Sequence, residues 1–160
     1  MTLDADQRTP GSEPINVLNP HNCFGCGALN AHGLKLTFFI DPEGNGVWTS
    51  FTPEPRFEGY AGVVHGGIIS AVLDEVMAWS LYRHEYWAVT AELSVRFRQS
   101  VVVGDATRAV GRLVADRGRV LDLTADLRRD RDGRLLATAT ARFMRVPEAQ
   151  AAAWRERYQS

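Results

Sequence analysis

The 160-residue sequence has few cysteines, no long apolar run and almost no net charge. Two cysteines are too few for a disulfide framework, and without an export signal they favour a reduced, cytoplasmic setting. No apolar stretch approaches the length of a membrane span, so no membrane partner is expected. The 18 basic and 19 acidic residues leave a net charge of −1, which offers no basic field for nucleic acid.

What is present fits one globular domain, because 45% of the residues are hydrophobic in a chain of this length. The first residues are polar and lack the basic start and apolar stretch of a signal peptide. We therefore expect residues 1–18 to form a disordered leader and residues 19–147 to form the domain. Residues 148–160 are expected to form a C-terminal helical tail.

Cys23 and Cys26 lie in a stretch rich in glycine and asparagine, which predicts a loop or turn assembly. Their spacing suits zinc, and His21 and His32 could complete four ligands. A structural zinc site usually pairs two such motifs, however, and only one is present. The sequence therefore favours a turn packed by its thiols, and no metal or cofactor is predicted.

Most of the domain reads as strands. Residues 34–40 and 47–51 predict a hairpin, and residues 89–98 alternate strictly, with Val89, Ala91, Leu93, Val95 and Phe97 on one face. Three further strands follow, each joined to the next by a short turn, within residues 106–115, 120–128 and 135–146. Long neighbouring strands with tight turns predict an antiparallel meander.

One long helix is predicted between the hairpin and the meander, over about residues 66–82. Its apolar side chains cover most of the circumference, which is typical of an enclosed helix rather than one on a surface. We expect a sheet, or a sheet and a second subunit, to enclose it.

The helix begins at His65-Gly66-Gly67, where backbone N–H groups lack intrahelical partners and the macrodipole is positive. Such an end suits an oxygen that carries or develops negative charge. Two turns later the helix carries adjacent acids, Asp74 and Glu75. Nine residues separate His65 from Asp74, about 13 Å along a helix, so one chain cannot use both groups on one carbonyl. Two antiparallel helices in a symmetric dimer would complete the site.

This combination resembles the hotdog-fold thioesterase superfamily, and more narrowly the PaaI-like acyl-CoA thioesterases. The segments that carry the resemblance are residues 23–27, 33–34, 58–67, 90–97 and 137–143, with Asp74 at the family offset from the histidine. The resemblance implies an α+β hotdog fold, a curved antiparallel sheet of about five to six strands wrapped around one long central helix. It also implies a homodimer, and a homotetramer as a dimer of dimers.

The same resemblance implies site roles. Asp74 matches the catalytic carboxylate, Gly66 the backbone donor that polarises the thioester carbonyl, His65 the residue that orients that end, and Thr90 the hydroxyl near the nucleophilic water. Gly67, Val64 and Glu75 are expected to contact substrate. Related enzymes often carry an amide side chain six residues before the histidine, where this sequence has Gly59.

The predicted function is hydrolysis of an acyl-CoA thioester at a dimer interface. Alternatives on the same scaffold are a non-catalytic acyl-CoA-binding protein and a hotdog hydratase or dehydratase, because a fold does not fix a function. The strand pattern alone puts Thr90 on the polar face with Glu92, and a solvent-facing threonine is the competing interpretation. Residues Tyr82, His84 and Trp87 are aromatic packing groups that could border the acyl pocket. The arginines at 128, 129, 131 and 134 are interpreted as a solvated hairpin rather than a CoA phosphate site.

Overall fold

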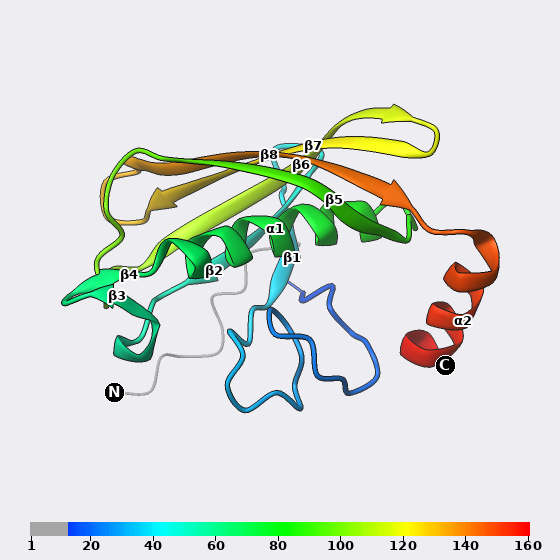
Figure 1. Cartoon of the computed structure of the whole chain (residues 1–160), viewed down its shortest axis with the longest axis horizontal. Helices are drawn as coiled ribbons and strands as arrows, with labels where there is room; N and C mark the ends of the chain where they lie inside the picture. Colours follow the sequence, from blue (N-terminus) through cyan, green and yellow to red (C-terminus); the bar gives the residue numbers. More distant parts are fainter. Residues whose placement is uncertain (1–12) are drawn as a thin grey trace.

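The computed structural model describes residues 13–160 as a curved six-stranded antiparallel sheet lying over one long helix, α1 (Figure 1). The strand order is β1-β2-β6-β7-β8-β5, so the four strands that follow α1 are adjacent and β5 is an edge strand. The main elements are β1 (Phe38–Ile40), β2 (Gly46–Phe51), α1 (Gly66–Tyr82), β5 (Ala88–Phe97), β6 (Thr107–Arg117), β7 (Val120–Arg129), β8 (Leu135–Arg145) and α2 (Glu148–Gln159). The expected α+β architecture is confirmed.

The first strand is shorter than predicted. Residues 34 and 36 do not extend β1, because their backbone N–H groups donate to the carbonyls of Phe24 and Gly25 in the preceding loop. Lys35 between them has a positive φ of 55°, which breaks the extended conformation. The N–H groups that a longer hairpin would have paired with β2 are therefore hydrogen-bonded to the loop instead.

The strict alternation predicted for β5 is wrong, because the strand contains a β-bulge. Thr90 pairs with Phe143 and Glu92 with Arg142, which leaves Ala91 as an extra residue. An extra residue reverses which face the preceding side chains occupy. Val89 is therefore 46% exposed, and Thr90 lies against the helix instead of on the outer polar face.

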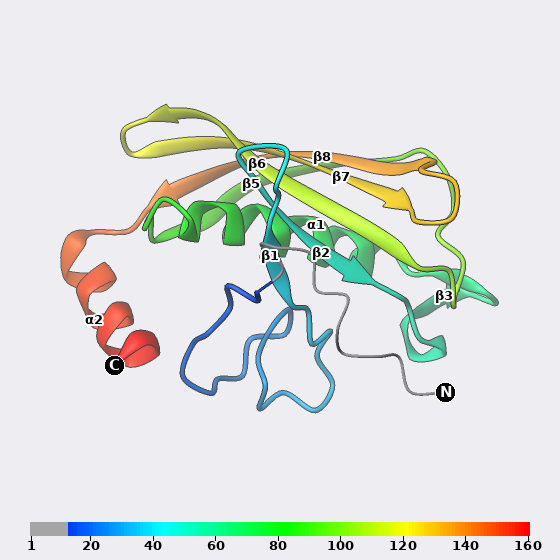
Figure 2. The ribbon, with the colours of Figure 1, turned by 180° about the vertical axis from the view of Figure 1, so that it is seen from behind.

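Helix α1 is enclosed on two sides, as its all-round apolar pattern predicts. On the sheet side it lies so close to β6 that a Cβ on Gly111 would be 2.6 Å from the Val76 carbonyl oxygen. On the other side the cover is the loop before β1, which the sequence did not suggest (Figure 2). A Cβ on Gly25 of this loop would be 2.5 Å from the Glu75 side chain, and Phe38 stacks on Trp79 at 5.3 Å.

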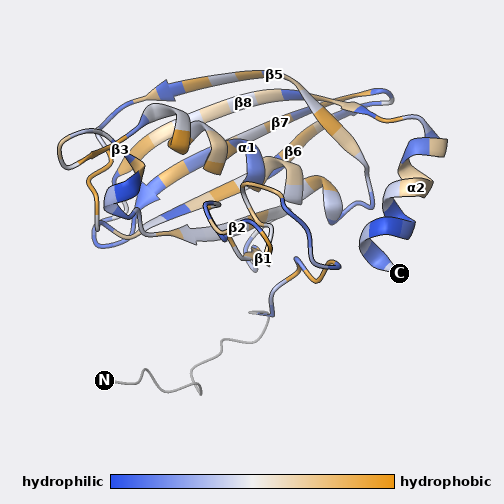
Figure 3. Ribbon diagram, turned by 60° about the horizontal axis from the view of Figure 1, so that its bottom comes forward, coloured by the Kyte–Doolittle hydropathy of each residue, from blue (hydrophilic) through white to orange (hydrophobic). Residues whose placement is uncertain are grey.

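Both ends of the described chain pack on the domain. Of the leader expected over residues 1–18, the part from residue 15 onward packs on the domain, because the Ile15 N–H donates to the Phe38 carbonyl at 2.8 Å. Residues 1–12 of the expected leader lie outside the described part of the chain. The expected C-terminal helix is α2, which is hydrophilic toward its end but buries Ala151 (Figure 3). Its Trp154 ring lies 6.0 Å from Trp87. Across residues 13–160, no helix is both long and apolar enough to cross a membrane.

Candidate active site

The start of α1 is fixed by a short helical turn, η1 (Pro55–Phe57), and a small hairpin of β3 (Glu58–Tyr60) and β4 (Val63–Val64). The His65 N–H donates to the Phe57 carbonyl at 2.8 Å. The His65 side chain caps the helix, since its Nδ1 accepts the Gly67 N–H at 2.9 Å. His65 therefore fixes the start of α1 through both its backbone and its side chain.

The Gly66 N–H is the open donor of this helix end. Within residues 13–160, no protein acceptor takes a hydrogen bond from it. A Cβ at Gly66 would lie 3.3 Å from the Phe97 ring of β5, and Phe97 is itself 54% exposed. A backbone donor at the positive end of a helix, beside an exposed apolar ring, can hold a carbonyl oxygen.

Gly59 lies against His65, since a Cβ there would be 3.2 Å from the His65 Cα. The position six residues before the histidine is therefore next to the helix start in space as well as in the sequence pattern. An amide at this position would border the same site. In this chain the neighbouring Glu58 carboxylate instead accepts the Gly62 N–H at 3.0 Å, which closes the β3–β4 turn.

Asp74 and Thr90 are brought together by the bulge in β5. The Thr90 hydroxyl donates to Asp74 Oδ1 at 2.8 Å. Burial raises the pKa of the half-buried Asp74 carboxyl, and the hydrogen bond from Thr90 opposes that rise. The result is a carboxylate oriented by a hydroxyl and poised as a stronger base than an exposed aspartate, which suits activation of a water molecule.

The other predicted residues do not join this pair within one chain. Gly66 lies on the same helix, eight residues and about 12 Å away. Gly67 is exposed at the helix start, whereas the Val64 side chain is only 6% exposed and packs in the core. Neither of the last two contacts Asp74 or Thr90 through a hydrogen bond in the described chain.

Glu75 faces the loop before β1 instead of Thr90. Its Oε1 lies 3.5 Å from Cys23 Sγ and accepts the Trp79 Nε1–H at 3.3 Å. Burial raises the pKa of Glu75 to about 7. The hydrogen bond with Cys26 lowers the pKa of Cys23 to about 5, and the same contact, with burial, raises the pKa of Cys26.

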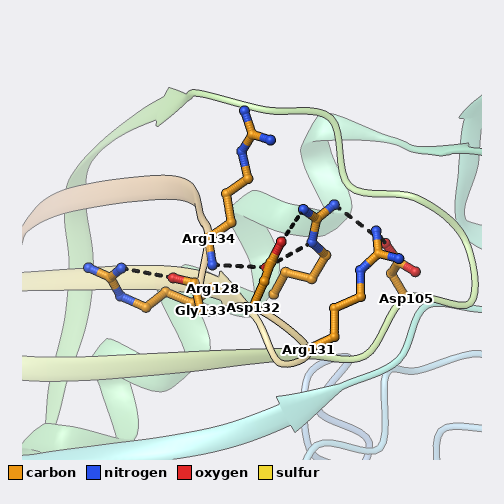
Figure 4. Close-up of polar contacts among 7 residues, drawn as sticks. Asp105, Arg128, Arg131, Asp132, Gly133 and Arg134 are labelled. Carbon is orange, nitrogen blue, oxygen red and sulfur yellow. Dashed lines mark hydrogen bonds and ion pairs between the residues drawn. The ribbon is translucent and has the colours of Figure 1, made fainter.

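The arginine-rich hairpin between β7 and β8 is paired with acids of its own (Figure 4). Arg129 forms a two-point contact with Asp132, and Arg131 reaches Asp105 at 3.5 Å. Arg128 donates to the Gly133 carbonyl at 3.1 Å, while Arg134 points away from these acids. This agrees with the interpretation of a solvated hairpin.

An aromatic cavity of about 240 Å³ lies between α1, the start of β5 and α2. Two of its lining residues are small: Ala78, one helical turn after Asp74 on α1, and Ala88, two residues before Thr90 on β5. Its aromatic lining comprises Trp79, Tyr82, Tyr86, Trp87, Trp154 and Tyr158. Of the three residues proposed from the sequence, Tyr82 and Trp87 line it, whereas His84 is exposed and stacks on Tyr86 from outside. In the sequence, the small residue Ala78, four positions after Asp74, was the feature that could have indicated a cavity beside α1 at this point.

Comparison with known proteins supports the same family. The thioesterase superfamily pattern matches residues 61–136. Over 76 residues, 48% of this chain and 31% of the relative, the sequence is 29% identical to the mouse (Mus musculus) acyl-coenzyme A thioesterase THEM5. The chain spans less than a third of the length of the curated relatives that it matches.

Two solved structures share the fold. One is Escherichia coli PaaI from the phenylacetic acid degradation operon (TM-score 0.64, 13% identity, 71% of this chain and 81% of that chain). The other is a Streptococcus mutans UA159 protein bound to acetyl CoA (TM-score 0.64, 21% identity, 69% of this chain and 88% of that chain). These structures confirm the fold that the resemblance implied, and the thioesterase superfamily match covers 76 of the 160 residues.

Proposed function

We propose that this chain, which matches the thioesterase superfamily over residues 61–136 and shares the fold of PaaI, hydrolyses an acyl-CoA thioester to a free acid and CoA. The observation that carries the proposal is the half-buried Asp74 carboxylate, held by the Thr90 hydroxyl at 2.8 Å on a helix whose first N–H is open. The mouse relative is named as an acyl-CoA thioesterase, and the Streptococcus mutans neighbour binds acetyl CoA. Both support CoA as the leaving group.

In the proposed reaction, the thioester carbonyl oxygen accepts the Gly66 N–H at the positive end of α1. Asp74 takes a proton from a water molecule as the water oxygen bonds to the carbonyl carbon. The resulting oxyanion is stabilised by the Gly66 donor, a contribution of about 3 kcal/mol in such sites. The C–S bond then breaks, and the CoA thiolate takes the proton from Asp74. Direct attack by Asp74, giving an anhydride that water cleaves, leads to the same products.

The proposed site is composite, formed by two copies of the chain. Asp74 and Gly66 of one chain are about 12 Å apart along α1, too far to act on one carbonyl. A two-fold axis between antiparallel α1 helices would place Gly66 of one copy near Asp74 of the other. The edge strand β5 supports such a contact, because Val89 and Phe97 on it are 46% and 54% exposed.

We further propose that the aromatic cavity beyond Asp74 holds the acyl group. Its lining includes Ala78, one helical turn after Asp74 on α1, and Ala88, two residues before Thr90 on β5. Aromatic walls with few polar groups favour an apolar acyl chain or ring over a charged one.

The direct test is loss of thioester absorbance in a panel of acyl-CoAs, which avoids thiol reagents that would also react with Cys23 and Cys26. Asp74→Asn keeps the shape of the side chain but removes the base, so we expect kcat to fall by about 10²- to 10⁴-fold. Asp126→Asn is the control, because it makes the same substitution at an aspartate of β7 outside the proposed site, and it should leave kcat unchanged. Equal rates in the wild type and Asp74→Asn would contradict the proposal. Tight acyl-CoA binding without turnover in the wild type would favour a non-catalytic binding protein.

A further inference from the structure

Cys23, Cys26 and Glu75 form a compact cluster that the proposed hydrolysis does not use. The two cysteines lie in the loop before β1, and Glu75 lies on α1, 52 residues after Cys23. One ligand atom from each residue can be chosen so that all three lie within 4.8 Å of one another. All three residues are partly buried, between the loop and the helix.

The donor set matches the preferences of one class of metal ion. Thiolates select thiophilic cations, and two sulfurs with a carboxylate oxygen are ligands that zinc accepts. With zinc–sulfur and zinc–oxygen bonds of the usual length, neighbouring tetrahedral ligands are about 3.6 Å apart. The Cys23 Sγ–Glu75 Oε1 distance is 3.5 Å. This pair therefore already lies at a spacing that fits the ion, and the third ligand atom is within 4.8 Å of both.

The cluster contains three acidic groups, and within residues 13–160 no protein cation forms an ion pair with its carboxylate. Among the residues that the structure describes, no arginine, lysine or histidine forms an ion pair with Glu75, whose other hydrogen-bond donor is the neutral Trp79 indole. A partly buried carboxylate with no paired cation is a group that a metal ion can coordinate. A divalent cation would balance the carboxylate and the thiolates together.

The loop is built to hold the two sulfurs in place. The Gly27 N–H donates to the Cys23 carbonyl at 2.8 Å, and a Cβ at Gly27 would lie 2.4 Å from the Cys23 nitrogen. The absence of a side chain at Gly25 admits Glu75, where a Cβ would be 2.5 Å from that side chain. The loop therefore curls tightly around the point where its sulfurs meet the helix.

The histidines offered by the sequence motif are not part of the cluster. His21 Nδ1 lies 3.3 Å from the Cys23 nitrogen and accepts its N–H, and the His21 ring packs edge-on against Tyr158 at 5.5 Å. His32 is exposed and its carbonyl accepts a hydrogen bond from Arg56. The third group of the cluster, Glu75, comes from the helix, at a sequence distance that no motif spacing reveals.

We propose that Cys23, Cys26 and Glu75 together bind a thiophilic divalent cation, zinc by ligand type, that fixes the loop before β1 to helix α1. Both thiols would bind as thiolates, with their protons passing to solvent. Three protein ligands leave one position of the zinc tetrahedron for water. The site is independent of the proposed hydrolysis.

The test uses the full chain without an affinity tag, purified under reducing conditions. We expect about one zinc per chain by mass spectrometry of the metal content. After removal of the zinc, titration with Co²⁺ should give the intense sulfur-to-cobalt charge-transfer band that thiolate ligation produces, saturating at one ion per chain. Because this measurement needs no variant, it remains decisive even if a substitution prevents folding.

Cys23→Ser and Glu75→Gln should each weaken Co²⁺ binding by at least about tenfold. Asp74→Asn is the matched control, because it removes the neighbouring carboxylate on the same helix and should leave Co²⁺ binding unchanged. A wild-type protein with two free thiols, no zinc and no charge-transfer band would overturn the proposal and leave a hydrogen-bonded loop contact. Equal losses in Asp74→Asn and Glu75→Gln would overturn the assignment of the carboxylate.

Discussion

At the scale of single residues, the two adjacent acids of α1 have separate surroundings. Asp74 receives the Thr90 hydroxyl from β5, whereas Glu75 faces Cys23 and Trp79 on the other side. Successive helix positions differ by about 100°, so neighbours in the sequence meet different parts of the fold. The surroundings of Asp74 fit the base that was predicted there. Glu75, which was predicted to contact substrate, instead contacts Cys23 and Trp79.

The hydroxyl of Thr90 should matter for catalysis because it orients Asp74. Thr90→Val removes the hydroxyl and keeps the shape, and a lost hydrogen bond to a charged group predicts a decrease in kcat of about ten- to a hundredfold. Thr90→Ser should restore most of the rate, whereas Thr140→Val on the exposed side of β8 should change nothing. Steady-state kinetics with one acyl-CoA would check this, and a Thr90→Val enzyme as fast as the wild type would show that the contact has no catalytic role.

At the scale of elements, apolar periodicity predicted the long helix and the strands after it, but it did not predict the bulge in β5. The bounds of α1 and the four strands after it follow from apolar spacing, which the chain keeps over long stretches. The extra residue Ala91 has no signature in composition, yet it decides that Thr90 faces Asp74. The contact of Glu75 with the cysteine loop joins residues far apart in the chain, and local patterns carry no information about such contacts.

In the proposed acyl site, the small side chain of Ala78 lines the aromatic cavity one helical turn from Asp74. Ala78→Leu should fill part of the cavity and raise KM for long or aromatic acyl-CoAs by about tenfold, the discrimination that a few methylenes supply in an apolar pocket. Acetyl-CoA is the internal control, because its acyl group is too short to enter, and its kcat/KM should change little. The same increase in KM for all substrates would place the acyl group elsewhere.

At the scale of the whole molecule, the proposed dimer is testable through complementation. Gly66→Pro removes the backbone donor, and proline is well tolerated at the first position of a helix when the preceding residue is extended, as His65 is (φ −60°, ψ 133°). Gly66→Ala is the matched control, because it adds the same Cβ near Phe97 but keeps the N–H.

Gly66→Pro and Asp74→Asn should each be inactive alone, while Gly66→Ala keeps most of the activity. After the two inactive variants are mixed, unfolded and refolded together, statistical pairing predicts about a quarter of the wild-type activity, since half of the dimers hold one intact site in two. No recovery in mixtures shown by mass to contain mixed dimers would contradict the composite site. The same mass measurement distinguishes a dimer from the predicted tetramer.

The bulge at Ala91 has a second consequence, for the solubility of the chain. An edge strand with an unbroken ladder is a template on which other chains add strands without limit, and proteins commonly interrupt such edges. In β5 the interruption falls between Thr90 and Glu92, so the regular part of the free edge is confined to residues 92–97. Six residues are an ordinary length for a strand that pairs with one symmetric copy, and a bulge at their start twists the rest of the edge away from further pairing. The residue insertion that turns Thr90 toward Asp74 would thereby also limit how many copies can assemble along this edge.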